Sequence, residues 1–335
     1  MDRSLLVFTG AALALAAAGC GLSEKFPERA IFVANGGDGT ISVIDPTDGR
    51  VVGEIEVDAG FHPHHLAISP DGTKLSVAAP NVDLSQGHGG DHASAASKVY
   101  LFDASSGSKS ASADVAATVH NVAFLDDFST VALAMMEHGM IAGYGASKLD
   151  EQWTVNVGKD PLEVTPVTGG RLLVANSGDG TISIVDGATH AALDTAAVGD
   201  MPIAVWNTPT GLFVSLEGDK KVAILSSGNL KDVTGTYDTA GIPGQVIATK
   251  SGGDVWIAVE DRGVVEVRAA SSGAVTQTID VGGKPHGLLF DPKANLVYVT
   301  DEAASRVIRI DATKYTVTDE IAVGAAPNGI VQNSF

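Results

Sequence analysis

The chain has 335 residues and a formal net charge of −19, with 40 Asp and Glu residues against 21 Lys and Arg. This charge argues against nucleic acid and anionic lipid headgroups as partners, because both need Lys and Arg to neutralise phosphate, and it favours cations. A single cysteine excludes disulfides within the chain.

The first 19 residues have the pattern of an export signal. Arg3 precedes an apolar stretch at 5–18 that is too short to span a bilayer, and small residues lead to Cys20. A lone cysteine here resembles the bacterial lipobox, in which the thiol is acylated, although Ala17 stands where a large aliphatic residue is usual. The alternative is an ordinary signal with an incidental cysteine. We expect a signal peptide at 1–19 and a lipid-anchored tether at 20–30, hence a periplasmic or cell-surface lipoprotein.

A repeated position along the rest of the chain predicts the architecture. A break at a proline or small residue is followed each time by an apolar run, with successive gaps of 56, 42, 41, 41, 42 and 42 residues. The positions are His64, His120, Leu162, Ile203, Gly244, His286 and Asn328. A period of about 40–45 residues with four short strands per unit is typical of a propeller blade. Seven units predict an all-β, seven-bladed β-propeller over 31–335.

The strands within a unit are clearest at 285–322. Apolar runs at 288–290, 296–300, 306–310 and 315–321 are rich in β-formers and are separated by Gly, Pro, Asp and Asn. Tight hairpins are expected at 36–39 and 177–180, where glycines supply the positive φ of short turns.

The two ends of the repeat predict how the ring closes. The first segment, Ile31–Asn35, has the pattern of a second strand, and the last, Asn328–Gln332, has that of a first strand. We therefore expect both termini to share one blade, which removes two exposed sheet edges.

Four segments resemble the YVTN family of β-propeller repeats. They are Phe32-Val33-Ala34-Asn35, Leu173-Val174-Ala175-Asn176, Val297-Tyr298-Val299-Thr300 and Ile68-Ser69-Pro70-Asp71-Gly72. The resemblance covers about residues 31–332 and implies the propeller fold. It implies little about chemistry, because that family is mostly of unknown or binding function.

Eight of the nine histidines are predicted at one mouth of the central channel. His64, His120 and His286 share the repeat position at the channel end of the innermost strand. The others at this mouth are His62, His65, His88, His92 and His138. Only His190 falls in a turn on the far face. The histidines also belong to neighbouring blades, which ordinary drift of a repeat does not explain.

The one long insertion, at 80–96, lies in the same sector and contributes His88, Asp91 and His92. A long loop inside a compact repeat is usually functional. Imidazoles with a carboxylate are common zinc ligands. We therefore predict a divalent-metal site, zinc in the first place, for metal capture or delivery. His64, His120 and His138 form its heart, His88, Asp91 and His92 close over it, and His286 is an outer member.

Other functions stay open at this point. The histidines of the repeat could instead bond the backbone of a neighbouring blade, and the insertion could be a disordered flap that attracts metal weakly. Exported zinc chaperones with a propeller fold and a His-rich loop are similar in outline only. A scaffold that binds protein or glycan is the main alternative, and lactonase-like or haem-binding propellers are weaker ones. With no acid and base pair that stands out, we expect a monomeric non-enzyme whose partners are a metal ion and a transport or surface protein.

Overall fold

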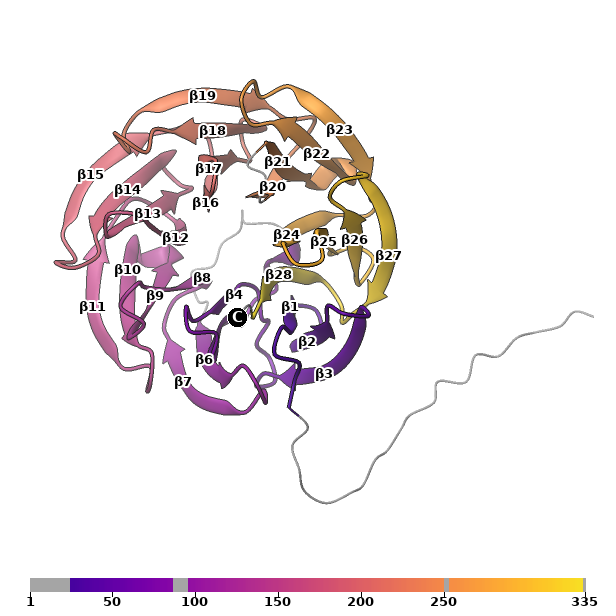
Figure 1. The fold of residues 1–335 in the computed structure, drawn as a ribbon. Coiled ribbons are helices and arrows are strands. Elements are labelled where there is room, and N and C mark those ends of the chain that lie inside the picture. The colour runs from indigo at the N-terminus through magenta and orange to yellow at the C-terminus, as the bar shows by residue number, and fades with distance from the viewer. Residues whose placement is uncertain (1–24, 87–95, 250–252, 334–335) are drawn as a thin grey trace, which may run out of the picture.

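The computed structural model describes residues 25–86, 96–249 and 253–333. Its 28 strands form seven four-stranded antiparallel sheets arranged in a ring, so the predicted seven-bladed β-propeller is confirmed (Figure 1). We number the blades 1 to 6 from β4 onward and call the blade shared by the two termini blade 7.

The strands of blades 1 to 3 follow one another along the chain. Blade 1 contains β4 (Leu66–Ile68), β5 (Lys74–Pro80), β6 (Ser97–Asp103) and β7 (Lys109–Val115). Blade 2 contains β8 (Val119–Phe124), β9 (Thr130–Met135), β10 (Met140–Gly145) and β11 (Glu151–Asn156). Blade 3 contains β12 (Pro161–Val167), β13 (Arg171–Asn176), β14 (Thr181–Asp186) and β15 (Ala192–Ala197).

Blades 4 to 7 complete the ring. Blade 4 contains β16 (Pro202–Thr208), β17 (Gly211–Leu216), β18 (Lys221–Leu225) and β19 (Val233–Asp238). Blade 5 contains β20 (Pro243–Ala248), β21 (Asp254–Val259), β22 (Val264–Ala269) and β23 (Val275–Asp280). Blade 6 contains β24 (Pro285–Asp291), β25 (Leu296–Asp301), β26 (Arg306–Asp311) and β27 (Thr316–Ala322). Blade 7 contains β28 (Pro327–Gln332), β1 (Ile31–Asn35), β2 (Thr40–Asp45) and β3 (Arg50–Glu56).

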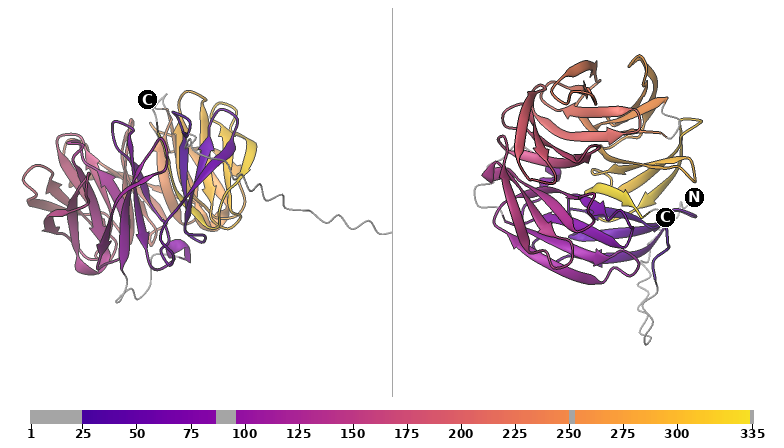
Figure 2. Two further views of the ribbon diagram at one scale, coloured as in Figure 1. Left: turned by 90° about the horizontal axis from the view of Figure 1, so that it is seen from below. Right: turned by 60° about the vertical axis from the view of Figure 1, so that its left-hand side comes forward.

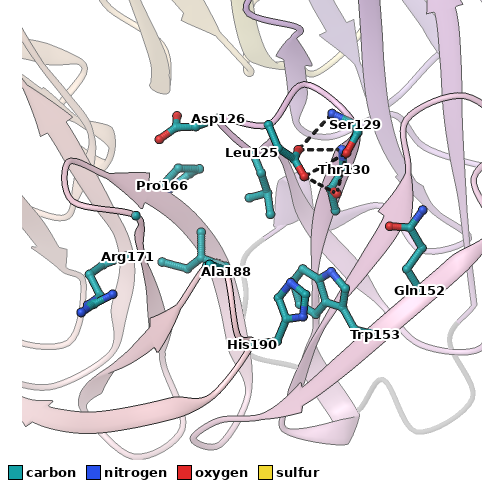
Figure 3. Close-up of a pocket in the computed structure, with 14 residues that line it drawn as sticks. Leu125, Asp126, Ser129, Thr130, Gln152, Trp153, Pro166, Arg171, Ala188 and His190 are labelled. Atoms are coloured by element: carbon teal, nitrogen blue, oxygen red, sulfur yellow. Dashed lines mark hydrogen bonds between the residues drawn. The ribbon is translucent and has the colours of Figure 1, made fainter.

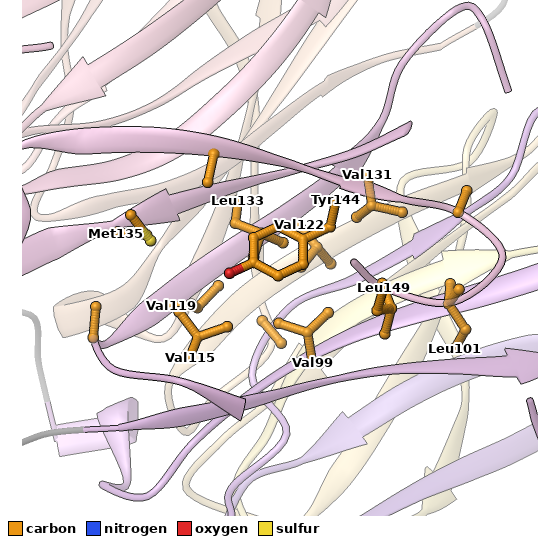
Figure 4. Close-up of a cluster of buried hydrophobic side chains, with 14 of the residues drawn as sticks. Val99, Leu101, Val115, Val119, Val122, Val131, Leu133, Met135, Tyr144 and Leu149 are labelled. Atoms are coloured by element: carbon orange, nitrogen blue, oxygen red, sulfur yellow. The ribbon is translucent and has the colours of Figure 1, made fainter. Parts of the chain in front are cut away.

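The core lies between neighbouring blades. Second strands such as β1 and β9 are buried along their whole length, because a blade is covered on both faces, and their sequences are continuous apolar runs. Fourth strands such as β3 are largely exposed at the rim. One cluster joins Val99 and Leu101 of blade 1 to Leu133 and Tyr144 of blade 2 (Figure 4). Blade-to-blade packing of this kind holds the ring together.

The ring closes as the sequence predicts. β28 pairs antiparallel with β1, with Ile31 opposite Gln332 and Val33 opposite Ile330. Beyond the last strand, the Asn333 amide donates to the Ala30 carbonyl at 2.9 Å. The C-terminal strand is therefore the innermost strand of blade 7.

The strands run between two faces of a disc, shown edge on in Figure 2. One face, the mouth, carries the connections that enter each first strand and those between second and third strands. The latter include the 3-10 turns η1 (Leu84–Gln86), η2 (Met136–His138) and η3 (Glu260–Arg262) and the hairpins at Gly39 (φ 70°) and Gly180 (φ 69°). The far face carries the remaining turns. Within residues 25–86, 96–249 and 253–333, no helix is long and apolar enough to cross a membrane.

Residues 25–30, which the sequence assigned to a polar tether, lie against the far face of the ring. The Phe26 ring contacts Phe32 edge to face, at a centroid distance of 6.3 Å, and the Phe26 amide donates to the Ser105 carbonyl at 2.8 Å. Arg29 forms an ion pair with Asp291 of β24. This part of the chain is thus docked on the propeller, and the rest of the tether, with Cys20, lies outside the described residues.

Candidate metal centre

Three histidines from two neighbouring blades converge at the mouth of the channel. His64 and His65 lie just before β4, and His120 is the second residue of β8. One nitrogen from each ring lies within 4.8 Å of the others, and the Nε2 atoms of His64 and His120 are 3.1 Å apart. The predicted convergence of His64 and His120 is therefore present, with His65 in addition.

A bulge at the start of the first strand brings both His64 and His65 into the cluster. The His64 amide donates to the Ala78 carbonyl at 2.9 Å, and the Ala78 amide donates to the His65 carbonyl at 3.0 Å, so two residues face one. Such a bulge disturbs the alternation of side chains between the faces of a strand. The register shifts at the same place in other blades, for example between Pro161 and Glu163.

The glycines at the second position of the repeat in blades 6 and 7, Gly287 and Gly329, have a packing reason at this bulge. A Cβ added at Gly287 would lie 2.5 Å from the carbonyl oxygen of Asn328 in the next blade. A Cβ added at Gly329 would lie 2.6 Å from the carbonyl oxygen of His64. Glycine thus permits close approach of neighbouring blades. Four blades carry polar side chains at this second position, namely His65, Asn121, Glu163 and Gln245, and of these His65 and Glu163 lie next to each other at the cluster.

Glu163 places a buried carboxylate beside the histidine cluster. Its Oε1 lies 3.5 Å from the Nε2 of His65, and its side chain is only 5% exposed. Burial raises the pKa of the Glu163 carboxyl to about 8, and the positive charge of His286 opposes the shift. The cluster together with this neighbour therefore contains three imidazoles and one carboxyl group.

His286 lies next to the cluster but belongs to a network of charges. Its ring centroid is 6.2 Å from that of His64 and 6.1 Å from that of His65, and its Nδ1 is 2.7 Å from the Oε1 of Glu260. Burial lowers its pKa, but the carboxylates of Glu260 and Glu302 outweigh burial and raise the pKa of His286 to about 9. His286 is not part of the converging group, and its Nδ1 is engaged by Glu260, so it is an outer neighbour of the cluster.

The network continues through a lysine that bridges the two glutamates. Lys284 Nζ lies 2.6 Å from Glu302 Oε2 and 3.7 Å from Glu260 Oε2, and it donates to the Ser85 carbonyl of η1 at 2.9 Å. The Asn328 side-chain amide donates to Glu302 Oε1 at 2.5 Å. These contacts tie blades 5, 6 and 7 to η1 around the mouth.

The geometry corrects the predicted place of His138. The prediction put it at the heart of the site, whereas the converging group of the described residues is His64, His65 and His120. His138 ends η2 with an exposed side chain, because the left-handed Gly139 (φ 59°) turns the chain there. His88, Asp91 and His92 lie outside the described residues, so their part in the site stays a prediction.

Two members of the site were missed from the sequence, although a signal for each is present. The sequence predicts His65 at the mouth but not among the ligands, because it stands one residue after the repeat position that His64 and His120 share. Glu163 occupies the position of His65 two blades later and follows Leu162, which is apolar. A comparison of the second position of the repeat would have found both.

His190 lies on the far face, as predicted. Its ring stacks on that of Trp153 with centroids 4.2 Å apart and an angle of 15° (Figure 3). The two rings line a cavity of about 460 Å³ between blades 2 and 3, together with Leu125 and Arg171. This cavity is separate from the histidine cluster at the mouth.

One pair of nitrogens in the cluster has the spacing of two ligands in a tetrahedral metal site. Ligand nitrogens at 2.0–2.1 Å from zinc are about 3.3 Å apart in tetrahedral geometry, close to the 3.1 Å between the Nε2 atoms of His64 and His120. The same distance fits an N–H···N hydrogen bond if one of the two nitrogens carries a proton. The His64–His120 pair therefore has a spacing that fits either two ligands of one metal ion or a shared proton, whereas the nitrogens of the whole group spread over as much as 4.8 Å.

The raised pKa values predict how stability depends on pH in metal-free protein. The folded pKa of His286, about 9, exceeds its ordinary value of 6.5, and that of Glu163, about 8, exceeds 4.5. Each contribution to stability is present below the ordinary pKa and is lost as pH rises through the folded pKa. We expect denaturant unfolding to show a free energy lower at pH 9 than at pH 6 by a few kcal/mol. His286→Gln should flatten this slope and His138→Gln should not, whereas a flat wild-type profile would contradict the assignment.

Comparison with known proteins gives the fold alone. No protein-family model matches the chain, and no curated protein matches it, so the YVTN resemblance stays an interpretation of the repeats. Similar solved structures include the periplasmic gluconolactonase PpgL of Pseudomonas aeruginosa, at 18% identity and a TM-score of 0.72, covering 91% of this chain and 98% of that one. A Lactobacillus plantarum protein has 14% identity and a TM-score of 0.74, with coverage of 91% and 98%. Apo AztD from Citrobacter koseri has 14% identity and a TM-score of 0.58, with coverage of 92% and 98%.

Proposed function

We propose that this protein binds a divalent transition-metal ion through His64, His65 and His120, and that zinc is the preferred ion. The observation that supports this is the convergence of three imidazole nitrogens within 4.8 Å at the mouth of the channel. Borderline imidazole ligands suit zinc, copper(II) and nickel, whereas calcium and magnesium prefer oxygen. The Glu163 carboxyl group is placed to join or orient the ligands, as acidic neighbours of metal-bound histidines do.

The surroundings of the site favour a cation. The mouth loops carry an excess of acidic residues, which raises the local concentration of cations near the channel. The role we propose is binding of the ion for capture or delivery, in exchange with a transport or surface protein, and not catalysis. The alternative is a scaffold that binds protein or glycan without a metal ion, and such a protein should not respond to zinc.

Zinc should stabilise the folded protein. A ligand that binds only the native state adds about 2.7 kcal/mol at a concentration 100 times its Kd, which corresponds to a Tm higher by several degrees. The measurement is thermal unfolding of untagged protein, stripped with a chelator, with and without micromolar zinc. Magnesium at the same concentration is the control and should leave Tm unchanged. An unchanged Tm with zinc would favour the scaffold alternative.

The proposed location is outside the cytoplasm, with the protein held on a membrane by lipid on Cys20. The support is the sequence of the first 20 residues. Cys20→Ser should move the protein from the membrane fraction to the soluble fraction, since the thiol that would carry the lipid is gone. Ser23→Ala, in the same segment, is the matched control and should remain with the membranes. Equal membrane association of the Cys20→Ser variant and the wild type would remove the anchor from the proposal.

A further inference from the structure

The chain enters the propeller on the face opposite the histidine cluster. β1 begins at the far face, and residues 25–30 pack there. The Phe26 ring fills the space left by two glycines: a Cβ at Gly53 would lie 2.5 Å from Phe26 Cε1, and one at Gly107 would lie 2.9 Å from Phe26 Cε2. The Phe26 amide bonds the carbonyl of Ser105, in the turn between β6 and β7.

A buried ion pair holds the same segment to another blade. Arg29 bonds the Oδ1 of Asp291 at 2.5 Å, and the Asp291 side chain, at the far end of β24, is 0% exposed. The Ala30 carbonyl accepts from the Asn333 amide after β28. Residues 25–30 are thus fastened to blades 1, 6 and 7, and their exit point on the far face is set by side-chain packing.

The reach from this exit point to a lipid on Cys20 is short. Cys20 is five residues before Lys25, and a fully extended chain spans at most about 18 Å over that length. The strands that separate the two faces have about six residues, which is about 20 Å, and the loops add to this. An anchor at Cys20 therefore cannot reach around the ring to the mouth.

The distribution of charge points the same way and is an independent observation. Among the described residues, the connections at the mouth contain 12 Asp or Glu and 4 Lys or Arg. The connections at the far face, together with residues 25–30, contain 7 Asp or Glu and 6 Lys or Arg. A strongly acidic surface is repelled by anionic headgroups and a nearly neutral one is not. The far face is accordingly the one that can rest near a bilayer.

We infer that the far face of the propeller is its membrane-facing surface and that the histidine mouth points away from the lipid, open to the compartment. This rests on the anchoring at Cys20 proposed above. Residues 25–30 act as a short rigid strap that sets the orientation. The partner is the surface of the bilayer that holds the anchor.

The test compares two fluorescent probes on the anchored protein. Acylation occupies the only cysteine, so Thr47→Cys on the far face and Ala304→Cys at the mouth, both exposed positions, can each be labelled alone. The purified lipoprotein is placed on phosphatidylethanolamine–phosphatidylglycerol vesicles that carry an acceptor dye on their headgroups. We expect energy transfer several-fold greater from the probe at 47 than from the probe at 304.

The outcomes separate the orientation from the anchor. Vesicle-bound protein with equal transfer, or greater transfer from position 304, would overturn the orientation and leave the anchor intact. Protein that does not float with the vesicles would overturn both. Phe26→Ala, which loosens the strap, should narrow the difference between the probes, whereas Phe128→Ala, a phenylalanine on the same face that is 54% exposed, should not.

Discussion

Replacing both His64 and His120 with alanine is expected to lower zinc affinity by more than about 100-fold. Loss of residues that only support metal ligands already costs 10–100-fold, and here two of the three converging imidazoles are removed. The Nε2 atoms of these residues lie 3.1 Å apart within the cluster. The measurement is competition for zinc against a chelator of known affinity, at a pH where histidine is neutral.

The controls use histidines that the structure places elsewhere. His138→Ala removes an exposed imidazole from the same face, and His190→Ala removes one from the far face, so both should retain wild-type affinity. Because His64 and His120 are buried, the double variant could lose zinc simply by unfolding. His64→Asn keeps a polar side chain at the buried position, so it should stay folded and still bind zinc more weakly than the wild type. Identical affinity of the wild type and the double variant would remove the metal assignment.

Removing residues 328–335 is expected to abolish the cooperative unfolding of the whole ring. The deletion takes away the strand that pairs with β1 and buries Ile330, and it leaves the backbone groups of β1 and the inner side of blade 7 in water. The loss of several hydrogen bonds and of this apolar contact is roughly 5 kcal/mol or more, comparable with the whole stability of an ordinary domain. Thermal unfolding followed by circular dichroism measures the effect.

A peptide provides the matched control for this deletion. A synthetic segment of residues 327–335, added to the truncated protein, should pair with β1 and restore the transition, because only the covalent link is missing. The same peptide with Ile330→Asp should fail, since it would bury a charge beside Val33. A truncated protein as stable as the full chain would show that β28 is not needed for closure.

The fold was predictable because its signals repeat along the chain. Six of the seven blades are built from strands that are neighbours in sequence, so a period of 41 or 42 residues with four apolar runs is enough to predict the blades. The closure by Ile31–Asn35 and Asn328–Gln332 followed from the same pattern, since the repeat begins with a second strand and ends with a first strand. The position of His64 and His120 at the mouth, and of His190 on the far face, was predictable for the same reason.

The composition of the site was decided by contacts that no repeat encodes. His65 and Glu163 join it because a bulge presents two residues of one strand to the channel, and because two blades at different places in the ring bring these side chains within 3.5 Å. His286 shares the repeat position of His64 yet is drawn into an ion pair with Glu260 of the neighbouring blade. Which histidines converge and which one is held in an ion pair thus depends on neighbouring blades.

The sequence by itself therefore determined the number of blades, their closure and the face that carries the histidines, because strand periodicity and turn chemistry are local properties. Only the tertiary structure decided that His138 lies outside the histidine cluster and that His65 and Glu163 lie in contact there. It also decided that Phe26 and Arg29 fasten the entering chain to the far face. The physical reason is that these features are distances between segments far apart in sequence, set by how the ring brings the blades together.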